Sequence, residues 1–144
     1  MTLRVGDGTD PTTDTGPLVN DEAVTNVEEH VEDALAWGAV ILTGGRRVRP
    51  AAAVRDRFFA PTILGGVDDS MRIYSEETFG SVAPLIRFRT EDEVLRMAKN
   101  TPYGLAMYST PSASRLFRVA EGLSTGSSAQ TTGFPPLPTR LSAA

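Results

Sequence analysis

Cysteine is absent from this 144-residue sequence, which also has a single histidine, His30, and a single lysine, Lys99. The absence of cysteine excludes disulfide bonds, thiol nucleophiles and metal sites built from thiolates. One histidine also argues against a zinc centre, because zinc sites without cysteine use several histidines. The usual partners of a catalytic carboxylate are therefore scarce. We interpret His30 as a partly buried helix residue and not as a catalytic group.

Long hydrophobic runs are missing as well. The longest, around ALAWGAVIL, is too short to span a bilayer, and the N-terminal residues MTLRVGDGTD lack the apolar core of a signal peptide. A formal net charge of −4 argues against a nucleic-acid-binding surface. We therefore expect a soluble, cytoplasmic protein with no nucleic-acid partner and no membrane partner.

Arginine carries almost all of the positive charge, and five arginines gather between residues 46 and 57. Such a cluster could hold phosphate or the acidic groups of a partner. No aromatic residues alternate with the arginines, and their spacing is not helical, so the stretch is more typical of a solvated loop. The five residues are Arg46, Arg47, Arg49, Arg55 and Arg57.

Hydrophobic residues make up 40% of the chain and charged residues 22%, a composition typical of one globular domain or a piece of one. A helix is predicted from Asn20, whose side chain can cap it, to Gly38, which can end it. A second helix is predicted over TEDEVLRMAKN, where Thr90 and Glu93 form a capping box. A third is predicted over SASRLFRVAEG. The expected apolar positions are Ala23, Val24, Val27, Val31, Ala34 and Leu35 in the first helix, Val94, Leu95 and Ala98 in the second, and Leu116, Phe117, Val119 and Ala120 in the third.

Extended segments alternate with these helices. AVILTGG is predicted as a short buried strand, SVAPLIRF and YGLAMYS as further strands, and FFAPTIL as an edge or interrupted strand because of Pro61. Strands that alternate with helices favour crossover connections. We predict an α/β fold with a partial, mostly parallel sheet and flanking helices. Three helices would cover such a sheet thinly, which suggests that the chain is incomplete.

Two short motifs match known sites only superficially. GDGTDP at 6–11 starts like a dinucleotide fingerprint, but Pro11 replaces the third glycine and no helix follows; nor do its aspartates have the spacing of a calcium loop. GLSTG at 122–126 matches the nucleophile elbow of serine hydrolases, which needs a preceding strand and a downstream histidine. A helix is predicted before Ser124 and no histidine follows it. A serine hydrolase would need esterase activity that is lost on Ser124→Ala.

The stretch EETFGSVAPLIRF at 76–88 carries a stronger signal: at this point the sequence resembles the aldehyde dehydrogenase superfamily. Further blocks match in the family's order over roughly residues 3–126, and their character is closest to succinate-semialdehyde dehydrogenases. The blocks are LRVGDGTDPTTDTGPLVN, VEEHVEDALAWGAVILTGG, FFAPTIL, NTPYGLAMYS and RLFRVAEGLSTG. The resemblance implies a C-terminal segment of the catalytic domain.

The resemblance also assigns two site residues. It implies that Glu77 accepts hydrogen bonds from the hydroxyls of the nicotinamide-side ribose of NAD or NADP, and that Phe79 packs beside the same part of the cofactor. The alternative for Glu77 is a cap or an ion pair with Arg72 or Arg87. Where Ser81 stands the family commonly has proline, and the loss of that constraint loosens the turn that holds Phe79.

The family's nucleophilic cysteine, general base and cofactor-binding domain are implied to lie upstream of the matching region. We therefore expect residues 1–126 to be a truncated catalytic-domain segment, inactive alone and binding no cofactor alone, with no catalytic residue and no metal site. Residues 127–144, rich in small polar residues and proline, are expected to be a divergent, disordered tail. A frameshift near residue 126 and a start at Met1 within a longer ancestral gene would explain both ends.

An alternative function belongs to another class. A sheet without its covering domain would expose apolar patches and strand edges. The chain would then be a non-catalytic α/β interaction module that associates with itself or docks on a full-length relative.

Overall fold

The computed structural model describes residues 3–50, 56–101, 103, 106–109, 119, 122–123 and 127–130. The chain divides into two units, Met1–Arg87 and Phe88–Ala144. We call them unit 1 and unit 2 and describe each by itself. No helix in the described part of the chain is long and apolar enough to cross a membrane.

Helix α1, Asp21–Ala36, is the longest element of unit 1 and has the predicted ends. The Asn20 side chain accepts a hydrogen bond from the backbone N–H of Ala23 at 2.8 Å, which caps the helix. At the other end Gly38 has a φ of 99°, and the N–H of Ala39 donates to the carbonyl of Ala34 at 2.9 Å. This is the αL ending that favours glycine. Both predicted ends are confirmed.

The sheet of unit 1 has three strands in the order β1-β2-β3: β1 Val40–Thr43, β2 Thr62–Gly65 and β3 Val82–Leu85. β2 and β3 are parallel, and the short helix α2, Arg72–Ser75, lies in the connection between them. β1 is antiparallel to β2, and the described residues between these two strands contain no helix that could return the chain. The α/β class is confirmed, with a mixed sheet in unit 1.

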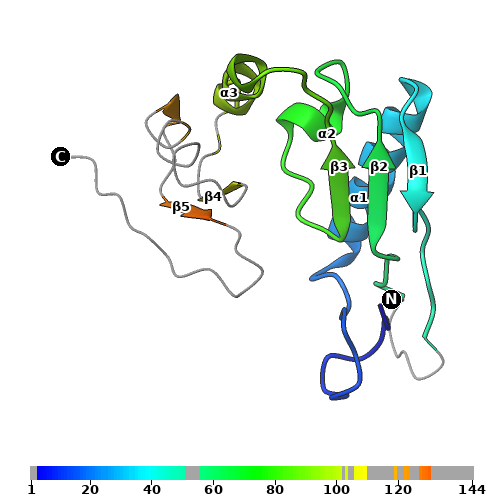
Figure 1. The fold of residues 1–144 in the computed structure, drawn as a ribbon. Coiled ribbons are helices and arrows are strands. Elements are labelled where there is room, and N and C mark those ends of the chain that lie inside the picture. The colour runs from blue at the N-terminus through cyan, green and yellow to red at the C-terminus, as the bar shows by residue number, and fades with distance from the viewer. Residues whose placement is uncertain are drawn as a thin grey trace. The chain divides into compact units, whose positions relative to one another are not determined.

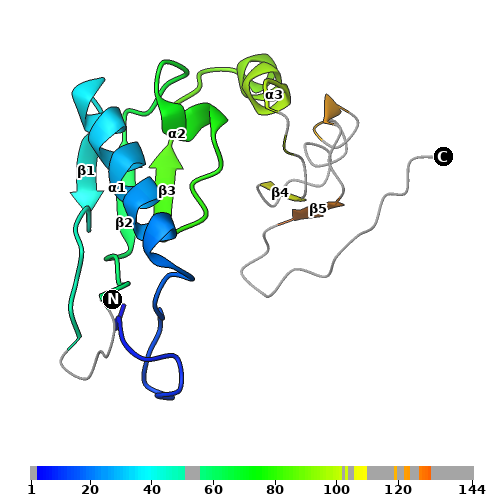
Figure 2. The ribbon, with the colours of Figure 1, turned by 180° about the vertical axis from the view of Figure 1, so that it is seen from behind.

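The front and back views show α1 packed along one face of this sheet (Figures 1 and 2). The core lies between the helix and the sheet. Val27, Ala34 and Leu64 have no exposed surface, and the core also includes Val31, Ala39, Phe59, Val67, Met71 and Ile73. Of the predicted apolar stripe of α1, four residues are buried, whereas Ala23 is half-buried and Leu35 is 40% exposed.

Two strand predictions were wrong in part. β1 was expected to be buried, but all four of its residues are exposed, with Leu42 at 58%, because β1 is an edge strand paired only with β2. β2 is the middle strand and not an edge. The strand is nevertheless interrupted as predicted: Phe59 pairs with Arg47 in an isolated bridge, and β2 begins directly after Pro61. The missing N–H of Pro61 therefore removes no bond within the strand.

Unit 2 contains α3, Glu91–Lys99, and the parallel pair β4, Ala106–Ser109, and β5, Ser127–Gln130. The hydroxyl of Thr90 accepts from the N–H of Glu93 at 3.2 Å, as predicted, while the Glu93 carboxylate reaches the N–H of Arg89 at 2.7 Å. No residue of α3 is buried. The expectation of a buried side was wrong: Val94 and Leu95 are half-buried and Ala98 is exposed.

The remaining predictions for unit 2 fall partly outside the described residues. Of the third expected helix, Val119 is helical and buried, whereas Leu116, Phe117 and Ala120 are not described. β5 lies within 127–144, the segment for which we expected no regular structure. Pairing through the backbone lets even small polar residues join a parallel strand. Residues 131–144 are not described, and the boundary at residue 126 stays a prediction.

Candidate functional site

The segment 76–80, which contains the predicted cofactor residues, forms a turn between α2 and β3. We call it the 76–80 turn. α2 ends where the N–H of Glu76 donates to the carbonyl of Arg72 at 2.8 Å. At the other end, the carbonyl of Ser81 accepts from the N–H of Thr62 at 2.8 Å. The turn is thus anchored to α2 on one side and to the start of β2 on the other. The second of these hydrogen bonds involves Ser81, the position at which the sequence predicted a looser turn.

Helix α1 holds this turn with polar side chains. The amide of Asn26 donates to the backbone carbonyl of Thr78 at 3.1 Å and lies 3.5 Å from that of Glu77. One turn further along the helix, the ring of His30 lies between two residues of the segment. Its Nδ1 is 2.9 Å from the hydroxyl of Thr78, and its Nε2 is 3.1 Å from a carboxylate oxygen of Glu76.

His30 has no exposed surface, so the expectation of partial burial was wrong. Burial of an imidazole is unfavourable unless its nitrogens have hydrogen-bond partners. Both nitrogens have one here, and no described buried side-chain nitrogen or oxygen lacks a partner. The only histidine of the sequence therefore lies directly beneath the 76–80 turn, 46 residues away from Glu76 in the chain.

Glu76 is a contact between helices and not a free surface acid. The guanidinium of Arg72 approaches its carboxylate to 3.0 Å and also lies 3.4 Å from Glu29 of α1. The hydrogen bond from Arg72, and after it the one from His30, lowers the pKa of Glu76 below its ordinary value. A carboxylate held ionised in this way is a hydrogen-bond acceptor only.

Glu77 and Phe79, the two predicted cofactor residues, are both exposed in the turn. Phe79 is 75% exposed, and its φ of 45° is the only positive value at a non-glycine position among the described residues. Glu77 is exposed as well. In the described part of the chain its carboxylate has neither a hydrogen bond nor an ion pair, because Arg72 is bound to Glu76 and Glu29 instead. The alternative pairing of Glu77 with Arg72 or Arg87 is thus not found.

Gly80 allows the turn to approach α1 closely. A Cβ atom at this position would collide with a methyl group of Val27, a buried residue of the helix. No other residue type fits here unless the helix or the turn moves. Gly80 therefore lets the chain pass from Phe79 into β3 while remaining against α1.

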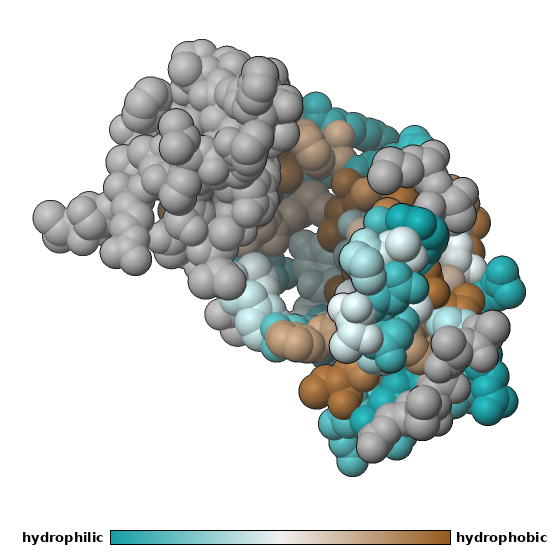
Figure 3. Space-filling view, turned by 90° about the horizontal axis from the view of Figure 1, so that it is seen from below, coloured by the Kyte–Doolittle hydropathy of each residue, from teal (hydrophilic) through white to brown (hydrophobic). Residues whose placement is uncertain are grey.

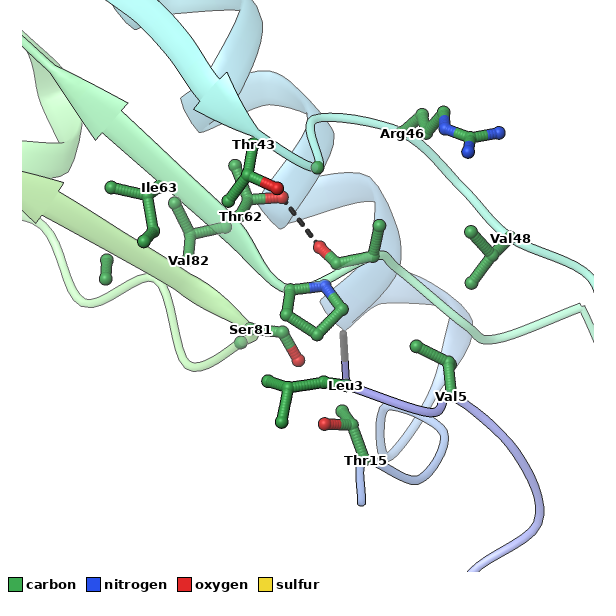
Figure 4. Close-up of a pocket in the computed structure, with 15 residues that line it drawn as sticks. Leu3, Val5, Thr15, Thr43, Arg46, Val48, Thr62, Ile63, Ser81 and Val82 are labelled. Carbon is green, nitrogen blue, oxygen red and sulfur yellow. Dashed lines mark hydrogen bonds between the residues drawn. The ribbon is translucent and has the colours of Figure 1, made fainter. Parts of the chain in front are cut away.

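An open pocket of about 830 Å³ lies beside the sheet of unit 1, and the turn contributes Gly80 to its lining (Figure 4). Thr43, Ile63 and Ala83 come from the three strands, and the N-terminal segment adds Leu3 and Val5. The hydroxyl of Thr62 donates to the carbonyl of Ala60 in the pocket wall. Arg46 is the only charged residue of this lining, which includes neither Glu77 nor Phe79. The described lining of the pocket contains no acid–base pair.

The described residues contain no cluster of three or more histidine, cysteine, aspartate or glutamate side chains that could hold a metal ion. What the turn offers chemically is a free carboxylate and an exposed aromatic ring, two residues apart in the chain. Sequence reasoning selected these two residues but did not find the contacts of Asn26 and His30 with the 76–80 turn, or that of Asp33, whose carboxylate accepts from the N–H of Arg72 at the start of α2. Their spacing of four and three residues on one helix could have indicated a polar face, but not which segment it binds.

Comparisons with known proteins identify the family of this chain. The model of the aldehyde dehydrogenase family matches residues 1–133. A probable succinate-semialdehyde dehydrogenase [NADP(+)] of Sinorhizobium fredii is 47% identical over 126 residues, which is 87% of this chain and 25% of that protein. The chain therefore belongs to the aldehyde dehydrogenase family, and it spans about a quarter of the length of the curated relatives it matches.

Solved structures show the same relationship. The crystal structure of succinate-semialdehyde dehydrogenase from Burkholderia pseudomallei has a TM-score of 0.83 and 46% identity, covering 92% of this chain and 27% of that one. Betaine aldehyde dehydrogenase from Staphylococcus aureus, solved in complex with NAD+, has a TM-score of 0.80 and 34% identity, covering 89% and 25%. The expected family and the succinate-semialdehyde dehydrogenase-like character are confirmed.

Proposed function

We propose that this chain is a catalytic-domain segment of an NAD(P)-dependent aldehyde dehydrogenase, and that it supplies the contact to the nicotinamide-side ribose through Glu77 and Phe79. The observation that carries the proposal is that Glu77, with a free carboxylate, and Phe79 are both exposed on one turn held by α1. Succinate semialdehyde is the proposed substrate of the complete enzyme, because a relative with that name is 47% identical. We place the enzyme in the cytoplasm.

The two side chains fit a ribose. An ionised carboxylate has two oxygens that accept hydrogen bonds, and neighbouring hydroxyls on a sugar ring present two donors at matching distance. The aromatic ring provides a flat apolar wall for the rest of that group. Both side chains are exposed, so neither has to leave a protein partner before it can bind. When bound, the nicotinamide accepts a hydride from the substrate.

The chain alone should not oxidise aldehydes. The family's reaction starts with attack of a cysteine on the aldehyde, and this sequence contains no cysteine. Among the described residues, the hydroxyl of Thr78 lies 2.9 Å from Nδ1 of His30, but we do not propose this pair as a substitute because the ring has no exposed surface. His30, the only imidazole, is fully buried between Thr78 and Glu76.

The chain alone should not bind the cofactor measurably either. Two charge-assisted hydrogen bonds to Glu77 would contribute about 3–6 kcal/mol at best. Association costs on the order of 4–15 kcal/mol, so the sum is near zero without the contacts of a cofactor-binding domain. Titration with NAD+ or NADP+ up to about 1 mM, which corresponds to roughly −4 kcal/mol, should give no saturable change in Trp37 fluorescence. A saturable change would contradict this expectation.

A chimera tests the assigned contact. Residues 3–126 of this chain would replace the matching segment of the Sinorhizobium fredii relative, and NADP+ reduction with succinate semialdehyde would be measured. Glu77→Gln in the chimera should raise the KM for NADP+ roughly tenfold, about 1.4 kcal/mol, because the neutral amide loses the charge-assisted hydrogen bonds. The matched control is Glu32→Gln, which removes the same charge from an exposed position of α1.

If Glu77→Gln changes the KM no more than Glu32→Gln does, the assigned ribose contact is wrong. If the unsubstituted chimera reduces no NADP+ although it is folded by circular dichroism, the segment cannot serve in an aldehyde dehydrogenase. The expected result is an active chimera in which Glu77→Gln raises the KM and Glu32→Gln does not.

One observation favours the second candidate, an interaction module that associates with itself or with a full-length relative. β1 is an edge strand, and Val40, Ile41 and Leu42 are 54%, 38% and 58% exposed. Hydrophobic side chains also reach the surface in the space-filling view (Figure 3). An exposed apolar strand edge can pair with another chain even when it is short. Size-exclusion chromatography would support the module by a discrete dimer or a stable mixed complex, and aggregation would count against it.

A further inference from the structure

One face of α1 contacts several residues between the start of α2 and Thr78. The carboxylate of Asp33 accepts from the backbone N–H of Arg72 at 2.8 Å, at the first residue of α2. His30 lies under Glu76 and Thr78, and Asn26 binds the carbonyl of Thr78. Positions 26, 30 and 33 repeat at intervals of four and three residues, the spacing of a single helical face. This polar face runs beside the apolar stripe that packs on the sheet.

We propose that His30, assisted by Asn26, is a positioning residue that sets the conformation of the 76–80 turn and thereby the direction of the Glu77 carboxylate. The inference rests on the proposed function for its last step only, the effect on the cofactor. Its first step, control of the turn by His30, concerns this chain alone.

The hydrogen-bond directions follow from the partners of the ring. An ionised carboxylate can only accept, so the Nε2 of His30 is the donor to Glu76 whether the ring is neutral or charged. In the neutral ring Nδ1 is then the acceptor, and the hydroxyl of Thr78 donates to it at 2.9 Å. One buried side chain thus binds the residues immediately before and after Glu77.

This arrangement constrains the backbone at Glu77 while leaving its side chain free. Glu76 and Thr78 are fixed by His30, and the Asn26 amide binds the carbonyl of Thr78 and lies 3.5 Å from that of Glu77. The next residue, Phe79, has a left-handed φ of 45°, a conformation that a bulky side chain adopts only when its surroundings hold it there. If His30 only filled space in the core, nothing would require both of its ring nitrogens to bind residues of the same turn.

The first experiment uses the full 144-residue chain without cofactor and measures amide hydrogen exchange by NMR. Thr78→Val removes the hydroxyl bound to His30 at nearly constant volume, and Glu76→Ala removes the other partner. Both changes lie on the turn, so the buried ring stays in place. We expect exchange at residues 77–80 to accelerate at least fivefold in each variant, with the amides of Val31 and Leu64 in the core unchanged. Thr25→Val, on the exposed side of α1, is the matched control.

Two substitutions separate positioning from simple packing. Glu76→Gln keeps a carbonyl oxygen that can accept from Nε2, so it should restore most of the protection lost in Glu76→Ala. His30→Leu fills the core without hydrogen bonds and should accelerate exchange at 77–80 as Thr78→Val does. Unchanged exchange at 77–80 in Thr78→Val and Glu76→Ala would overturn the inference, as would equal acceleration in the core.

The second experiment places Thr78→Val in the chimera described above. The expected result is a KM for NADP+ raised three- to tenfold with kcat changed less than twofold. If Glu77→Gln raises the KM and Thr78→Val does not, the positioning role is overturned while the proposed function stands. If exchange at 77–80 responds as expected but neither substitution alters the KM, the proposed function is overturned, and with it only the cofactor step of this inference.

Discussion

The helices α1 and α3 start with the same local signals and differ in what they bury. Each has a capping side chain, Asn20 or Thr90, and acidic residues in its first turn. α1 has five buried residues, including His30, whereas α3 has none. Capping decides where a helix begins, but packing supplies most of its stability. The candidate site is built on α1, the helix with the core beneath it.

The largest expected difference between the two units comes from truncation of apolar side chains. Leu64 has no exposed surface and packs in the core under α1, so Leu64→Ala should destabilise unit 1 by about 2–5 kcal/mol. Val94 on α3 is only half-buried, and Val94→Ala should cost unit 2 less than about 1 kcal/mol. Amide hydrogen exchange measures the stability of each unit separately. Equal effects would mean that α3 has a core contact comparable to that of α1.

A second difference concerns two glycines that lie against these helices. Gly80→Ala would push a methyl group into Val27 of α1, and overpacking of this kind costs about 1–3 kcal/mol. Gly122→Ala would approach Leu95 of α3 at 3.2 Å, where the end of a flexible side chain can move aside. We therefore expect a lowered Tm of unit 1 for Gly80→Ala and no comparable change for Gly122→Ala, both measured by thermal unfolding. Val27→Ala combined with Gly80→Ala should restore part of it, and failure to do so would contradict the steric cause.

The two caps should give similar and smaller effects. Asn20→Ala and Thr90→Ala each remove one side-chain hydrogen bond to the first turn, worth about 1 kcal/mol. The loss should appear in exchange of the first-turn amides of the respective helix. The increase in amide exchange should extend over more residues of α3 than of α1, because no buried residue stabilises the rest of α3. If the increase in exchange extended equally far in both helices, the difference in burial between α1 and α3 would not explain their stability.

The smallest expected effect is the acid sensitivity of the 76–80 turn. Arg72 and His30 lower the pKa of Glu76 in the folded chain from its ordinary value of 4.5. The contribution of Glu76 to stability is therefore complete above that pH and is lost as the pH falls through the lowered pKa. Exchange protection at residues 77–80 should fall in this acidic range and should depend less on pH in Glu76→Gln. An identical pH profile in the two proteins would exclude this role of Glu76.

Local features of the fold were predictable from the sequence, because their causes lie within a few residues. The Asn20 cap, the Gly38 ending and the Thr90 cap were all confirmed. Pairing between distant segments was not predictable in the same way. The exposure of β1 depends on which strands lie beside it, and its sequence, VILT, is typical of a buried strand.

The residues of the candidate site also fall into those that the sequence could identify and those that it could not. Glu77 and Phe79 could be selected because a motif of adjacent residues carries them. The support beneath them could not, since His30 reaches Thr78 across 48 residues and Asn26 reaches it across 52. A search for apolar periodicity passes over such polar side chains. They are recognisable only once packing has brought the helix and the turn together.

The polar face of α1 makes the length of this helix as important as its composition. Each residue advances a helix by about 1.5 Å and rotates it by about 100°. A single residue inserted between Asn26 and His30 would carry one of them a quarter-turn away from the turn that both bind. Natural variation in this segment should therefore be confined to exchanges of side chains.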